Sequence, residues 1–125
     1  MTASNEPSTT APPVRRFRDP AYRPVAGSLA ELRQRIDSLD EQIVALLAQR
    51  AECVRDATRF KRDAFQVQAP ARQAQVFEHV RALAAAHESA FPGLPDIVEA
   101  AYRTLVAGYI AAEGQLFQQT EAIEP

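Results

Sequence analysis

The sequence is poor in residues that several protein classes need. It has 4 glycines in 125 residues, which argues against a phosphate-binding loop and against a turn-rich β fold. A single cysteine, Cys53, cannot form an internal disulfide, and we expect it to pack as a small apolar residue in a reducing compartment. No apolar run approaches the roughly 20 residues of a membrane span, and the N-terminal segment lacks the apolar core of a signal peptide. These features predict a cytoplasmic protein without a membrane segment.

The charge balance excludes a strong global field of either sign. Fourteen basic and sixteen acidic side chains give a formal charge of −2, so nothing in the overall charge attracts nucleic acid or an anionic membrane. His79 and His87 stand without cysteines or carboxylates at a matching spacing, so we predict surface histidines and no metal site. The length fits one domain, and the predicted fold class is all-α.

Residues 1–27 differ in composition from the rest of the chain. Five of the nine prolines lie there among Ser, Thr and Asn, which predicts a disordered or loosely ordered arm. Its basic residues are Arg15, Arg16, Arg18 and Arg23. A role in binding nucleic acid or an anionic surface is one interpretation, but short basic tails are usually solvated.

Apolar periodicity predicts three helices in residues 28–120, followed by a tail at 121–125. Ser28 and Glu31 have the spacing of a capping box, and a helix of roughly 35 residues, about 50 Å long, is expected to follow. Its apolar seam runs through Leu29, Leu32, Ile36, Leu39, Ile43 and Leu46, then Cys53, Ala57 and Phe60. A second helix is predicted from Pro70 to near His87, and a third from Asp96 to about Thr120.

The first helix is longer than its two partners, so part of its apolar seam would stay uncovered within one chain. An exposed stripe of that length would promote aggregation. We therefore expect a homodimer in which two long helices pair.

One position of the seam carries a cation. The apolar series predicts a hydrophobic residue at position 50, where the sequence has Arg50. For a lone arginine, a buried ion pair or a snorkelling side chain is the ordinary interpretation. Lys61, the only lysine, lies eleven residues further on, and a continuous helix would return it to within about 20° of the same face. The two cations would then leave room for an anion between them.

Two more arginines and one glutamate complete the candidate set. Arg72, in the first turn of the second helix, can point toward the core. Arg33 lies about 25 Å from Arg50 along the first helix, so it could reach a shared ligand only in the partner of an antiparallel dimer. Glu113 follows Tyr109 at helical spacing and so lies along an apolar strip, although an exposed helix-end glutamate is the alternative.

These positions resemble the all-helical chorismate mutase family. The resemblance rests on Leu32-Arg33-x-x-Ile36-Asp37-x-Leu39-Asp40-x-x-Ile43-x-x-Leu46-Leu47-x-x-Arg50, followed by Lys61 and Arg72, and extends from about residue 28 to 117. It implies an intertwined homodimer of three-helix chains that rearranges chorismate to prephenate without a cofactor. By resemblance, Arg50 and Arg72 bind the substrate carboxylates with Arg33 of the partner chain, and Lys61 donates to the ether oxygen.

Two residues depart from the family's pattern. Many bacterial members have glutamine at the position of Glu113, the second donor to the ether oxygen, and a carboxyl group donates only when it is protonated. The resemblance therefore implies greater activity at acidic pH. Gln73 stands where many mutases have a glutamate that binds the substrate hydroxyl, a role that an amide can still fill.

Two alternatives remain open at this stage. Thr58-Arg59-Phe60-Lys61 and the segment Val67-Gln68-Ala69-Pro70-Ala71-Arg72 resemble the isochorismate-pyruvate lyases of the same fold, which form salicylate and pyruvate. The mutase remains the favoured interpretation. A third hypothesis is a non-catalytic helical interaction or regulatory module, in which Arg50 and Lys61 pair with acidic residues of a partner.

Overall fold

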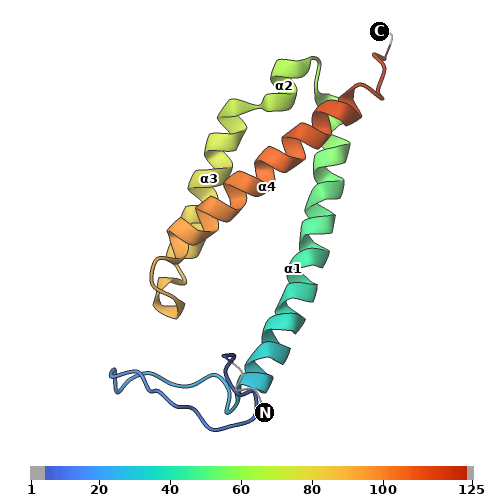
Figure 1. The fold of residues 1–125 in the computed structure, drawn as a ribbon. Helices are drawn as coiled ribbons and strands as arrows, with labels where there is room; N and C mark the ends of the chain where they lie inside the picture. The colour runs from blue at the N-terminus through green and yellow to red at the C-terminus, as the bar shows by residue number, and fades with distance from the viewer. Residues whose placement is uncertain (1–4, 124–125) are drawn as a thin grey trace. The chain divides into compact units, whose positions relative to one another are not determined.

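The structure, a computed structural model, describes residues 5–123, and all the regular secondary structure in these residues is helical (Figure 1). Three long helices, α1 (Leu29–Ala57), α3 (Pro70–Ala85) and α4 (Leu94–Phe117), account for most of these residues. Shorter elements join them: η1 (Thr58–Phe60), α2 (Ala64–Gln68) and η2 (Glu88–Ala90). No strand occurs within 5–123, so the predicted all-α class with a long first helix is confirmed.

The chain divides into two compact units, with the boundary between Ala48 and Gln49 inside α1. In the first unit, the Ser28 hydroxyl caps the start of α1 by accepting a hydrogen bond from the Glu31 amide at 3.2 Å. The Glu31 carboxylate reaches back and accepts from the Gly27 amide at 3.2 Å, one residue earlier than in a standard capping box. The predicted helix start is therefore confirmed.

Much of the apolar seam of α1 in the first unit is open to solvent. Leu29 and Leu32 are partly buried, but the next four members of the seam are each more than half exposed, namely Ile36, Leu39, Ile43 and Leu46. A helix face of this kind is normally buried against another element. The single chain therefore leaves the seam uncovered from Ile36 to Leu46.

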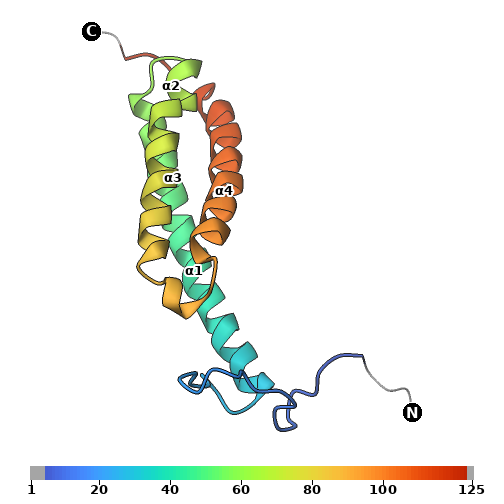
Figure 2. The ribbon, with the colours of Figure 1, turned by 90° about the vertical axis from the view of Figure 1, so that its left-hand side faces the viewer.

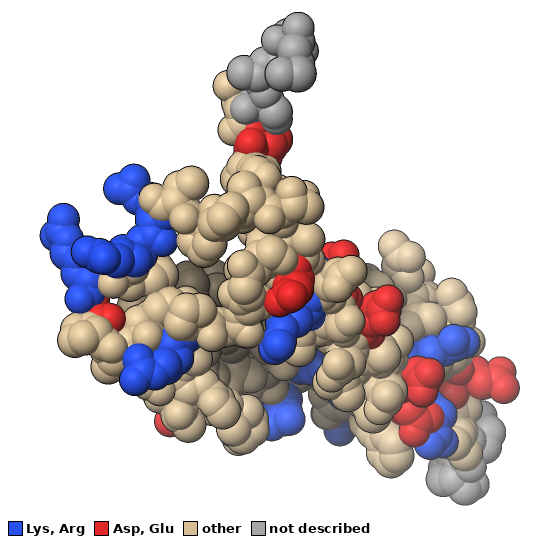
Figure 3. All heavy atoms as spheres, turned by 90° about the horizontal axis from the view of Figure 1, so that it is seen from below, with Lys and Arg blue, Asp and Glu red and all other residues tan. Residues whose placement is uncertain are grey.

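The arm that precedes α1 contains no helix or strand from residue 5 to residue 27. Its exposed arginines are Arg15, Arg16, Arg18 and Arg23. Figure 3 shows Lys and Arg side chains gathered at the left of that view, with few Asp or Glu side chains among them. The rings of Phe17 and Tyr22 pack together with centroids 4.6 Å apart. Whether the arm is loosely attached stays a prediction.

The core of the second unit lies between α3 and α4, which run side by side (Figures 1 and 2). Its buried centre is formed by Val76, Val80 and Val106, with Phe77, Val98, Tyr102 and Ile110 packed around them. On α4 the successive members are four residues apart, and on α3 they are Val76, Phe77 and Val80, so each set lies on one face of its helix. Toward the start of α4, Arg81 of α3 binds Asp96 at 2.7 Å and Glu99 at 3.1 Å.

The predicted helix boundaries are wrong in one region that matters for the site. α1 ends at Ala57, about five residues before the end that periodicity predicts, because the buried Thr58 hydroxyl donates to the Val54 carbonyl at 3.3 Å and a 3-10 turn follows. Asp63 then caps the short helix α2 by accepting from the Gln66 amide at 3.0 Å. Lys61 stands between these elements in extended backbone, not on α1.

The remaining boundaries differ by a few residues. α3 ends at Ala85, and α4 begins at Leu94. Pro95 stands in the first turn of α4, where the backbone N–H that proline lacks would have no partner within the helix. α4 ends at Phe117, ahead of the predicted Thr120. Among the described residues, no helix combines the length and the apolar character needed to cross a bilayer.

Candidate active site

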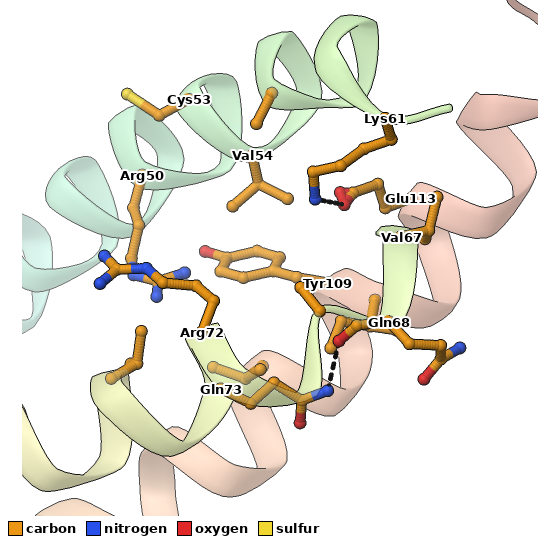
Figure 4. A pocket seen from close by; sticks show the side chains of 15 residues that line it. Arg50, Cys53, Val54, Lys61, Val67, Gln68, Arg72, Gln73, Tyr109 and Glu113 are labelled. Atoms are coloured by element: carbon orange, nitrogen blue, oxygen red, sulfur yellow. Dashed lines mark hydrogen bonds and ion pairs between the residues drawn. The ribbon is translucent and has the colours of Figure 1, made fainter. Parts of the chain in front are cut away.

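A pocket of about 320 Å³ lies in the second unit (Figure 4). Its walls come from the end of α1, the segment after η1, α2, α3 and α4. The volume is that of a site for a small molecule. Its polar lining includes five of the predicted site residues, namely Arg50, Lys61, Arg72, Gln73 and Glu113.

Two arginines occupy the same end of this pocket. Figure 4 shows the side chains of Arg50 from α1 and Arg72 from α3 reaching into that end. Within residues 5–123, neither guanidinium has a carboxylate partner; Arg72 donates to the Gln75 side chain at 3.5 Å. The buried ion pair that was the ordinary interpretation of Arg50 is therefore absent from the described part of the chain. Two unneutralised cations in one pocket favour the binding of an anion.

Arg50 is half-buried and contacts aromatic rings of α4. Its guanidinium carbon lies 5.6 Å from the ring centroid of Tyr102 and 5.4 Å from that of Tyr109. Both distances fall within the range of a cation–π interaction. The rings stabilise the cation while leaving its charge unneutralised.

The other end of the pocket holds an ion pair. The Lys61 ammonium donates to Oε1 of Glu113 at 3.3 Å, across the gap between the segment after η1 and α4 (Figure 4). The side chain of Lys61 is 22% exposed and that of Glu113 only 4%. The alternative interpretation of Glu113 as an exposed helix-end residue is therefore wrong.

The second carboxyl oxygen of Glu113 is the most unusual atom of the site. Oε2 is buried and has no hydrogen-bond partner among the residues that the structure describes. Buried polar atoms are nearly always hydrogen-bonded, and an exception calls for a partner such as a ligand. An unpaired oxygen beside an ammonium group is suited to contact a polar atom of a small molecule in the pocket.

Lys61 lines the same pocket as Arg50 for a reason other than the predicted one. The predicted placement of both cations on one face of a continuous helix is wrong, because α1 ends at Ala57. The chain instead leaves the helix through η1 and places Lys61 in the pocket from extended backbone. The two residues do line one pocket, as predicted.

Gln73 is tied to the backbone that forms the pocket wall. Its side-chain amide donates to the Gln68 carbonyl at 2.6 Å, bridging the joint between α2 and α3. At this joint Ala69 adopts the left-handed conformation, with φ 44° and ψ 57°. The amide nitrogen of Gln73 is thus used within the chain, and its side-chain oxygen is the atom that could accept a bond from a ligand.

Three further residues differ in how they relate to the prediction. Arg33 lies in the first unit with an exposed side chain, and its assignment to a partner's site stays a prediction. Cys53 is exposed and lines the pocket, so the expectation that it packs as an apolar residue is wrong. Cys53 lies about one turn after Arg50, on the exposed surface of α1. Tyr109 lines the pocket, although its helical spacing predicts only a position in an apolar strip.

No site for a metal ion is apparent in the described part of the chain. No three His, Cys, Asp or Glu side chains come together there in a way that could hold one. His79 and His87 are both exposed, in agreement with the prediction. The polar groups that line the pocket include the charged side chains Arg50, Lys61, Arg72 and Glu113.

A comparison with models of protein families identifies the family of this chain. The sequence model of a protein family described as chorismate mutase type II matches residues 32–114, which is most of the chain. The matched range includes Arg33 and every predicted site residue of the pocket. No curated protein sequence matches the chain closely enough to be reported as a relative.

Proposed function

The chain belongs to the type II chorismate mutase family, and on this basis we propose that it converts chorismate to prephenate. The observation that carries the proposal is the arrangement of charge in one pocket. Arg50 and Arg72 lack carboxylate partners in the described residues at one end, and Lys61 with Glu113 stands at the other. Such a pocket complements a small molecule that carries two carboxylates and an ether oxygen.

The proposed reaction is a [3,3] rearrangement with no covalent intermediate and no proton transfer. The enzyme can therefore act only by selecting the compact conformer of the substrate and by stabilising charge that develops in the transition state. Arg50 and Arg72 bind the carboxylates and hold the substrate in that conformer. No nucleophile, metal or cofactor takes part in this proposal.

Lys61 and Glu113 act at the ether oxygen in the proposed mechanism. The Lys61 ammonium donates to this oxygen as the carbon–oxygen bond lengthens and negative charge accumulates there. Glu113 supplies a second donor when its carboxyl group is protonated. Its unpartnered Oε2 supports this role, because that atom is buried in the wall that Lys61 also reaches. Gln73 contributes its side-chain oxygen to the substrate hydroxyl.

The proposal includes an intertwined homodimer with shared sites. The exposed seam of Ile36, Leu39, Ile43 and Leu46 supports it, because pairing with a second copy would bury those side chains. Arg33 lies on the same stretch of α1. In the dimer, Arg33 of one chain reaches the pocket of its partner and adds a third cation for the carboxylates.

A second candidate function is the elimination of pyruvate from isochorismate, which gives salicylate. One observation favours it: Val67, Gln68 and Ala69, which belong to the segment that resembles the lyases, line the pocket. The two activities are distinguished by their substrates and products. Mutase activity gives prephenate from chorismate, whereas lyase activity gives salicylate from isochorismate.

The experiment that tests the proposal is incubation of the purified full chain with chorismate and, separately, with isochorismate. We expect prephenate from chorismate, and the Lys61→Ala variant serves as the control for a contaminating enzyme. Salicylate alone would replace the mutase by the lyase. No product from either, together with no thermal stabilisation by chorismate, would leave a non-catalytic interaction module; a ligand at about 100 times its Kd should stabilise by about 2.7 kcal/mol.

A further inference from the structure

We propose that Tyr102, which lies outside the pocket lining, is a positioning residue that holds Arg50 in its ligand-binding orientation. The inference rests on the proposed function, since it assigns Arg50 to a substrate carboxylate. Tyr102 packs against the core cluster of Val76, Val80 and Val106. Its ring is therefore held in place by the core, and it affects the binding of a ligand only by restraining Arg50.

The geometry places the guanidinium of Arg50 within reach of two rings on one helix. Tyr102 and Tyr109 are seven residues apart on α4, which returns the second ring to within about 20° of the first. The guanidinium carbon is 5.6 Å and 5.4 Å from the two ring centroids. No other group in the described residues fixes its position by a hydrogen bond or an ion pair.

Aromatic rings restrain an arginine without neutralising its charge, as a carboxylate partner would. A carboxylate would hold the arginine more strongly, but it would neutralise the charge and use the donors that an anionic ligand needs. A ring attracts the cation through its face and leaves the five N–H donors of the guanidinium available. Arg50 can thus be restrained before the ligand arrives and still bind it with full charge.

Arg103, on the same helix as the two tyrosines, differs from Arg50 in its partners. Its guanidinium carbon lies 4.4 Å from the ring centroid of Phe77, and its Nε donates to Glu99 at 2.8 Å. This arginine has both a ring and a carboxylate, and it does not line the pocket. Of these two arginines, Arg50 lines the pocket and is held by rings alone, which is the arrangement expected for a group reserved for a ligand.

The proposal predicts a specific kinetic effect. Arg50 binds a carboxylate in the substrate and in the transition state alike, so weaker restraint should raise KM and leave kcat nearly unchanged. For Tyr102→Leu we expect KM to rise about two- to tenfold, the range of one cation–π contact. Tyr102→Phe keeps the ring and should stay within about twofold of the wild type.

Phe77→Leu is the matched control. It removes a ring from the same core that contacts a different arginine, Arg103 of α4, so it should lower stability in a similar way. It should not raise KM for chorismate. A structural role for Tyr102 would make the two leucine variants alike, whereas the proposal requires that only Tyr102→Leu raises KM.

A double-mutant cycle isolates the route through Arg50. In the Arg50→Ala background, Tyr102→Leu should raise KM no further, because the group that it restrains is already gone. An equal effect of Tyr102→Leu in both backgrounds would overturn the proposal. So would an unchanged KM in the single variant.

A second measurement does not depend on turnover. In ¹H–¹⁵N spectra of arginine side chains, the Hε signal of Arg50 should be displaced by the ring currents and should move toward the unstructured position in Tyr102→Leu. An unmoved signal would overturn the positioning role even in an active enzyme. If neither chorismate nor isochorismate is converted, the proposed function fails, while a displaced signal still supports the restraint of Arg50 by its rings.

Discussion

Replacement of Glu113 by glutamine tests how the ether oxygen receives its second hydrogen bond. The wild-type carboxyl group accepts from Lys61 through Oε1 and carries an unpartnered Oε2 within the described residues. A carboxylate can only accept, whereas an amide donates at every pH. We therefore expect Glu113→Gln to be more active than the wild type at neutral pH and to show a flatter pH profile.

The size of the gain follows from one hydrogen bond. A neutral hydrogen bond contributes about 0.5–1.5 kcal/mol, and about 1.4 kcal/mol corresponds to a tenfold change in rate. We expect kcat/KM at pH 7 to rise about two- to tenfold. At acidic pH, where the carboxyl group can donate, the advantage of the amide should shrink.

The substitution should leave the protein folded. At 3.3 Å and an effective dielectric constant of about 20, the attraction between Lys61 and Glu113 is about 5 kcal/mol. Against this stands a desolvation cost of several kcal/mol for each charge, which is largest for the glutamate because its side chain is only 4% exposed. The substitution relieves the desolvation cost of the glutamate only, since Lys61 stays partly buried, but the glutamine side-chain oxygen can still accept from Lys61. The variant should therefore stay folded, and its Tm, measured beside the rates, checks this.

The assay is the initial rate of chorismate consumption across the pH range in which the wild type stays folded. Glu113→Ala is the control, since it removes the charge without supplying a donor and should show no gain at neutral pH. Superimposable profiles of the wild type and Glu113→Gln would refute the reasoning. A glutamine variant that loses activity at neutral pH would do the same, because it would show that the negative charge is needed.

Further predictions concern the shared site and the response to acid. Lys61→Ala and Arg33→Ala should each be inactive, but an equal mixture after subunit exchange should recover about a quarter of the wild-type activity, because half the dimers are mixed and each has one intact site; no recovery after verified exchange would contradict a shared site. The hydrogen bond from Arg103, with a smaller contribution from Arg81, lowers the pKa of Glu99 below 4.5 despite the opposing effect of desolvation. The stabilisation is therefore present above pH 4.5 and is lost as the pH falls through the lowered pKa, so Tm of the wild type should fall more steeply with acidification than that of Glu99→Gln; parallel curves would show that the ion pair adds nothing.

The three long helices could be predicted because their apolar residues recur at helical spacing over many turns. The end of α1 could not be predicted in this way. No proline or glycine marks it, and the break depends on the Thr58 hydroxyl bonding the Val54 carbonyl and on Asp63 capping the next helix. Hydrogen bonds from side chains to backbone groups leave no trace in the apolar periodicity of the sequence, so this pattern cannot predict a helix end that depends on them.

The cations of the site could be predicted because they interrupt an apolar pattern or stand alone in the composition. The aromatic pair of Tyr102 and Tyr109 could not, since two tyrosines seven residues apart on a helix are typical of a core. Their contact with Arg50 depends on a side chain of another helix, more than fifty residues earlier. The Lys61–Glu113 pair was missed for the same reason, as it joins residues 52 positions apart.

Ala69 determines more of the pocket than its single methyl group suggests. An alanine in the left-handed region costs about 1–2 kcal/mol, and here it is the residue at which α2 ends and α3 begins. A glycine would relieve that cost but would let the angle between the helices vary, because glycine has far more accessible conformations. Arg72 stands in the first turn after this joint. The joint therefore fixes where the backbone of Arg72 stands in the pocket wall, so that less reorganisation of the chain is left for the moment of binding.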